Sequence, residues 1–288
     1  MPSSAAAPQQ STPPPMNAAF DMRRTRHAIG EFSATLKFFQ AVSSNTFAKV
    51  KQTAQREATR LELPVPIRQQ TFQFAIGPNV QLPPAQMPEG FGFHSFARTG
   101  EIETAILCEP DGVVLTLHDY DSWQIVHPMI VETLGNLAEE YLTEVPAVRS
   151  FAVQYLNEFK SHEPGNVSTA EVFKPNRWLP KFGVEGDQPW HCHSGVFIPR
   201  DARSRFLVNV NFDIGTSLEP TGAPHTLLKL LILVSLNFDV QGQPPLTVAV
   251  GDAREVLKEI SDTVHGVEKD VLGEVLSEDY LKMVGAIK

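Results

Sequence analysis

The segment EFSATLKF, residues 31–38, places an apolar side chain at every second position. This period of two is typical of a β-strand with one buried face and one solvated face. The next stretch, residues 45–61, carries apolar side chains at three-four spacing, which predicts an amphipathic helix that ends before Pro64. A strand followed by such a helix indicates a sheet that packs its apolar face on helices. The buried side chains of the strand are expected to be Phe32, Ala34, Leu36 and Phe38.

The same two periods recur along the rest of the chain. In the first half we expect a helix over 122–142 that follows strands near residues 72–76, 91–98, 103–109 and 113–118. In the second half we expect a long helix from 252 and a short one after 277, preceded by strands near 150–159, 190–198, 205–214 and 226–240. Each half therefore begins with a strand, continues through a helix or an irregular segment and antiparallel strands, and closes on a long helix.

This order predicts an α+β fold of two similar units, residues 27–146 and 147–288, with curved antiparallel sheets packed on long helices. The prediction rests on element order alone, and a single continuous domain is the alternative.

Residues 1–26 are set apart because they are rich in Pro, Ala, Ser and Gln, and no charged side chain precedes Asp21. Such a stretch buries too little apolar surface to offset its ordering entropy, which predicts a disordered tail.

Composition excludes several classes of protein. Hydrophobic residues make up 42% of the 288 residues and charged residues 20%, which are ordinary values for a globular protein. Two cysteines, Cys108 and Cys192, are too few for a disulfide framework or a four-cysteine zinc site. The net charge of −9 argues against nucleic-acid binding, which needs a basic surface. The one tight basic cluster, residues 23–27, is interpreted as a solvated flank of the tail.

Neither an export signal nor a membrane span is expected. The first residues lack a cationic region followed by an apolar one. The longest apolar run, residues 227–236, contains Lys229 and is shorter than the about 20 residues that cross a bilayer. We interpret this run as a strand whose two apolar faces are both covered, and we expect a cytoplasmic protein that does not bind membranes.

Common catalytic signatures are missing from the sequence. It contains no G-x-S-x-G, no phosphate-binding glycine loop, no G-x-G-x-x-G and no H-E-x-x-H. These absences exclude the enzyme classes that are easiest to identify, although not enzymes in general.

The best remaining constellation lies on the two strands expected near residues 190–198 and 205–214. Because side chains alternate along a strand, His191 and His193 share a face, and pairing of the apolar faces would place Asp213 beside them. Two imidazoles and one carboxylate can bind a divalent metal or transfer protons. The alternatives are a polar binding patch and a solvated sheet face with a structural role. Further candidates for binding near this face are Trp190, Asn209 and Asn211.

Two other polar features have a structural and a functional interpretation. His118 and Asp119 lie between an expected strand and an expected helix, where acidic residues commonly cap the helix, although a binding or catalytic role is the alternative. His265 lies in the apolar stripe of the last long helix and is interpreted as a half-buried, hydrogen-bonded histidine. Cys108 and Cys192 are interpreted as ordinary core residues.

Four short segments resemble, in order, the motifs of a known family. Residues 120–123 are similar to its Y-x-S-W motif, 154–157 to R-Y-x-N, 237–240 to D-x-D-V, and the region from 264 to 277 to a closing helix with L-H, F and I-T. The family is a sporadically distributed group of uncharacterised bacterial proteins. The chain departs from it at Gln154, Asn237 and Leu272, where the family carries arginine, aspartate and phenylalanine. The resemblance implies an architecture and not an activity.

Taken together, these observations favour a non-enzymatic module that binds a small ligand or another protein, through a cavity or a sheet face. A homodimer is left open. The alternative is a metal-dependent or acid–base enzyme that uses His191, His193 and Asp213. No cofactor is assigned from the sequence, and a divalent metal is considered only for that alternative.

Overall fold

A computed structural model describes residues 21–22, 28–68, 90–98, 100–161, 169–181, 190–218, 222–284 and 286. The strands are β1 (Asp21–Met22), β2 (Ile29–Phe38), β3 (Val65–Arg68), β4 (Phe91–Phe96), β5 (Ile102–Glu109), β6 (Gly112–Leu117), β7 (Ala147–Ser161), β8 (Trp190–Pro199), β9 (Arg205–Leu218), β10 (Pro224–Asn237) and β11 (Leu246–Thr247). The helices are α1 (Ser44–Arg60), α2 (Trp123–Leu142), α4 (Ala253–Val275) and α5 (Glu278–Met283), with short 3-10 turns η1 (Thr169–Glu171) and η2 (Val250–Asp252).

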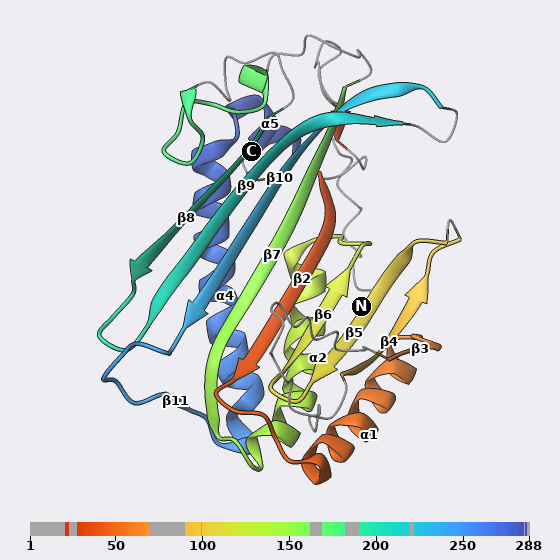
Figure 1. The fold of residues 1–288 in the computed structure, drawn as a ribbon, viewed down its shortest axis with the longest axis vertical. Helices are drawn as coiled ribbons and strands as arrows, with labels where there is room; N and C mark the ends of the chain where they lie inside the picture. The colour runs from red at the N-terminus through yellow and green to blue at the C-terminus, as the bar shows by residue number, and fades with distance from the viewer. Residues whose placement is uncertain are drawn as a thin grey trace, which may run out of the picture.

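Within the described residues, these strands form a single sheet in which every pair is antiparallel. The main path has the order β3-β4-β5-β6-β2-β7-β10-β9-β8, and β1 and β11 both pair with β7 (Figure 1). The predicted α+β class is therefore confirmed. The strand expected near residues 72–76 lies outside the described residues, as do residues 1–20 and 23–26 of the predicted tail.

The prediction of separate curved sheets for the two halves is wrong. β2 pairs with β7 from Ile29 opposite Asn157 to Phe38 opposite Val148, so the expected boundary at 146/147 falls next to a central strand of one sheet. Local periodicity identifies strands but carries no information on which strands become neighbours, because pairing is decided by the whole set of apolar faces. Similarity between the two halves in construction stays a prediction.

The long helices lie together on one face of this sheet (Figure 1). The alternation in β2 places Phe32, Ala34, Leu36 and Phe38 in the core beneath them, as predicted. α2 contacts both α1 and α4, so the three helices form one layer. Ser43 caps the start of α1 by accepting a hydrogen bond from the backbone N–H of Thr46.

The opposite face of the sheet is less buried than the face that packs on the helices. In β10, the side chains on the helix side are buried, for example Leu230 and Ile232, whereas Leu231 and Leu233 on the other side are only half-buried. The helices of this chain cover one side of the strand only, so cover of its other face stays a prediction. Within the described residues, no helix combines the length and the apolar character needed to cross a membrane.

Candidate functional site

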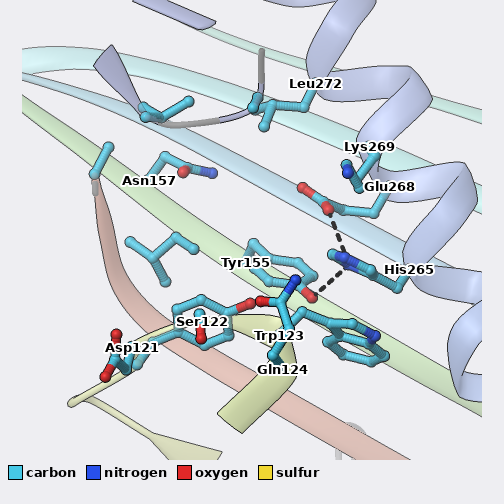
Figure 2. A pocket seen from close by; sticks show the side chains of 15 residues that line it. Asp121, Ser122, Trp123, Gln124, Tyr155, Asn157, His265, Glu268, Lys269 and Leu272 are labelled. Atoms are coloured by element: carbon cyan, nitrogen blue, oxygen red, sulfur yellow. Dashed lines mark hydrogen bonds and ion pairs between the residues drawn. The ribbon is translucent and has the colours of Figure 1, made fainter. Parts of the chain in front are cut away.

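A cavity of about 300 Å³ lies where the start of α2, the middle of β7 and one face of α4 meet (Figure 2). Side chains from distant parts of the chain reach it for simple geometric reasons. Tyr155 and Asn157 are two residues apart in β7 and therefore share its helix-facing side. His265, Glu268 and Leu272 follow three-four spacing on α4 and therefore share one face of that helix.

His265 occupies the centre of a polar contact between α4 and β7. Its Nδ1 lies 3.0 Å from the phenolic oxygen of Tyr155 and 3.5 Å from Oε2 of Glu268. Figure 2 shows the three side chains converging on the cavity wall. The sequence-based expectation that His265 is half-buried and hydrogen-bonded is confirmed.

The Glu268 carboxyl is almost fully removed from water, with 4% of the residue exposed. Burial raises its pKa, because the charged form loses hydration, whereas His265 and Lys269 lower the pKa without cancelling that effect. Burial, together with the nearby Glu268, also raises the pKa of Tyr155 well above its ordinary value. The site therefore holds two buried groups whose neutral forms are favoured.

Trp123 fixes the orientation of the imidazole from the α2 side. Its indole ring is stacked between His127 and His265, with ring centroids 4.7 Å and 4.1 Å away and interplanar angles of 15° and 16°. The indole Nε1 donates a hydrogen bond to Oδ1 of Asp262 at 3.1 Å. Because α4 supplies both Asp262 and His265, Trp123 joins α2 to α4 at the edge of the cavity.

Tyr120 and Asn157 are two buried polar residues that also line the cavity. Tyr120, just before α2, packs against Phe32 and Tyr155, with ring centroids 5.4 Å and 5.8 Å away, and burial raises its pKa. Asn157 is buried, and its amide nitrogen donates to the carbonyl of Leu230 at a long 3.4 Å. An oriented imidazole, a buried carboxyl, a phenol and an amide thus surround one small volume, and such groups can bind a polar molecule or exchange protons with it.

The residues proposed from the sequence lie elsewhere. The register between β8 and β9 pairs His191 with Asp213, His193 with Asn211 and Gly195 with Asn209, so the predicted shared face is confirmed. This face is turned away from the helices, however, and both histidines are exposed. Trp190 alternates to the other side of β8 and is half-buried. In the part of the chain that the structure describes, no three His, Cys, Asp or Glu side chains are grouped as a metal site would require.

His118 and Asp119 are near the cavity in sequence but do not line it. His118 lies at the end of β6 with Nε2 3.7 Å from Oε2 of Glu31, and Asp119 is exposed. Cys108 is buried, which raises the pKa of its thiol, and Cys192 is half-buried beside the carbonyl of Trp178. Both cysteines are free thiols.

Sequence reasoning did not identify Tyr155, Asn157 or Glu268 as site residues. Tyr155 and Asn157 were assigned to a strand, and only the tertiary fold shows that this part of the strand faces a cavity. Glu268 did leave a signal, because it interrupts the apolar stripe of α4 four residues after Val264. A carboxylate in such a stripe is seldom buried without a partner, so that position was a candidate for function.

Comparison of this chain with family models, with curated proteins and with solved structures finds no match. Three of the four segments that resemble the bacterial family contribute residues to this cavity. Residues from three of the four, namely 120–123, Tyr155 with Asn157, and His265 with Leu272, line the cavity, whereas the segment 237–240 does not.

Proposed function

We propose that this protein is a binding module that holds a small organic molecule in the cavity between α2, β7 and α4. The observation that carries the proposal is the set of polar groups on the wall of a cavity of about 300 Å³, where the buried Tyr155 and Glu268 both contact the half-buried His265. This volume lies at the lower end of the range for small-molecule sites, which combine apolar walls with a few placed polar groups. Ile29, Leu272 and Val284 supply the apolar part of the wall.

The preformed geometry supports binding as the role. Holding the Glu268 carboxyl away from water with one long polar contact costs free energy, and a chain selected for stability alone would gain by replacing it with a well-packed apolar side chain. Stacking on Trp123 holds His265 in one orientation, which lowers the entropy that a ligand would lose in ordering the site. These features are typical of a site that is ready for a ligand.

The enzymatic alternative based on His191, His193 and Asp213 has less support. These side chains lie on the open face of β8 and β9, outside the cavity, and the two histidines are exposed. An exposed sheet face offers neither exclusion of water nor convergent groups, which acid–base chemistry on a bound substrate requires.

A cavity-filling variant tests the proposal. Leu272→Phe adds volume at a position that lines the cavity. Phenylalanine is also the residue found at this position in the family that the sequence resembles. Leu218→Phe is the matched control, because Leu218 lies at the end of β9 with 68% of the residue exposed. A library of small fragments is screened against the full chain by ligand-observed NMR, and native mass spectrometry of protein purified gently from its host reports any retained molecule.

We expect fragments that bind the wild type and Leu218→Phe but not Leu272→Phe, while circular dichroism shows that all three chains are folded. Fragment binding that is unaffected by Leu272→Phe would place the ligand elsewhere and overturn the assignment of the cavity. A screen without any hit, together with a bare mass in the native spectrum, would overturn the binding function itself.

A further inference from the structure

We propose that the ligand is an organic cation, a protonated amine with a small apolar body, and that the Glu268 carboxylate receives its ammonium group. This inference rests on the proposed binding function and adds the chemical class of the ligand.

The first observation concerns the hydrogen bonds of Glu268. Among the described residues, its one close polar partner is Nδ1 of His265 at 3.5 Å. Charge-assisted hydrogen bonds between nitrogen and a carboxylate are usually about 2.7–2.9 Å long, so this contact is weak. A carboxylate with two oxygens can accept several hydrogen bonds. The buried carboxyl on the cavity wall can therefore accept further hydrogen bonds besides the contact with His265. An ammonium group in the cavity could donate them.

The second observation is the charge on the cavity wall. Among the described residues that line it, the acidic side chains are Asp121 and Glu268 and the basic one besides His265 is Lys269, which is exposed to solvent. Burial raises the pKa of Glu268, and an ammonium group that donates to this carboxyl favours its charged form, which a neutral or anionic ligand does not. Lys269 has less influence on the charge of the ligand, because water screens exposed groups. The net charge of −9 on the whole chain adds attraction for cations at long range.

The third observation is the apolar part of the wall. Ile29, Leu272 and Val284 can contact a hydrocarbon body, and the aromatic ring of Tyr155 lies near the carboxyl. Aromatic faces also attract cations. An anionic ligand could approach Lys269 and the start of α2, but it would meet the carboxylates of Asp121 and Glu268. The combination favours an amine over a carboxylate of the same shape.

Three probes with one carbon frame test the charge of the ligand: benzylamine, benzyl alcohol and benzoate. Isothermal titration calorimetry near neutral pH measures their affinities for the full-length chain. We expect benzylamine to bind about tenfold or more tightly than either analogue, since a charge-assisted hydrogen bond is lost in both. Glu268→Gln keeps the shape but removes the charge, and we expect it to abolish the preference for benzylamine. Glu259→Gln, at an exposed position on the same helix, is the control that keeps it.

The remaining outcomes separate this inference from the proposed function. Equal affinity for the three probes, or a preference for benzylamine that survives Glu268→Gln, would overturn the amine assignment while leaving a binding cavity. Tighter binding of benzoate that is lost in Lys269→Met would also overturn it and would identify an anion site. Fragments that bind in the cavity without any binding of benzylamine would also overturn the amine assignment. A screen in which no fragment binds would overturn the binding function as well.

Discussion

The phenolic oxygen of Tyr155 lies 3.0 Å from Nδ1 of His265, although the two residues are 110 positions apart in the chain. This contact joins β7, a central strand of the sheet, to α4, the helix that covers it. Apolar packing alone permits small rotations of a helix about its axis, whereas a hydrogen bond between a buried and a half-buried side chain selects one rotation. The same contact forms part of the cavity wall, so stability and the proposed binding function depend on the same pair.

Tyr155→Phe should destabilise the fold, because it removes the hydroxyl group that His265 contacts and leaves a buried polar atom without that partner. We expect the free energy of unfolding to fall by about 1–2 kcal/mol, measured by urea denaturation. A double-mutant cycle with His265→Ala isolates the pairwise term. A coupling free energy near zero would show that the contact contributes nothing to stability.

The stability of Glu268→Gln relative to the wild type should increase as pH rises. Burial raises the folded-state pKa of Glu268 above its usual value of 4.5, so the folded protein binds this proton more tightly than the unfolded chain does. That contribution to stability is complete below the unfolded pKa and is lost as pH rises through the folded pKa. Glutamine is neutral at every pH, so the variant does not lose this stability as pH rises.

The measurement is the melting temperature of the wild type and of Glu268→Gln between about pH 5 and about pH 8, with Glu259→Gln as an exposed control. His265, Tyr155, Tyr120, Asp121 and Lys269 surround Glu268 and are present in both chains. The difference in melting temperature should therefore report on Glu268. A variant that is less stable than the wild type by the same amount at every pH would show that folding does not change proton binding at Glu268, and it would contradict this prediction.

Gly92→Ala should weaken the pairing of β4 with β5. A methyl group at Gly92 would lie 2.2 Å from the backbone carbonyl oxygen of Ile106, which cannot move without breaking the ladder. We expect a loss of about 1–3 kcal/mol in the free energy of unfolding, by chemical denaturation. Gly215→Ala in β9 is the matched control, because a methyl group there meets nothing within 4 Å. Equal effects of the two substitutions would contradict the steric explanation.

Replacing His191 and His193 together by alanine should leave the protein intact. Both side chains are exposed on the open face of the sheet, where surface substitutions usually change stability by about 0.5 kcal/mol or less. Thermal denaturation and elemental analysis of the purified double variant check this expectation. Metal that is bound to the wild type and lost from the variant would instead support the metal-dependent alternative.

The positions of some candidate residues could be predicted from the sequence. The register of β8 on β9 followed from the apolar residues alone, since Val196 pairs with Val208 and Ile198 with Phe206. His265 was correctly expected to be half-buried and hydrogen-bonded. Its partners, Tyr155 and Glu268, were not expected, because the pattern that marks a residue as inward-facing does not reveal whether it meets another side chain or a cavity.

The sequence by itself determined the local elements: the alternation from residue 31 to 38 produced β2, and three-four spacing produced α1, α2 and α4. These outcomes depend on which side chains a few neighbouring residues can bury together, and that information is local. Only the tertiary structure decided that β2 and β7 join the two halves in one sheet, and that Trp123, Tyr155 and Glu268 meet around one cavity. The physical reason is that strand order and cavities depend on how all the apolar faces and side-chain volumes of the chain pack together, which no single segment of the sequence determines.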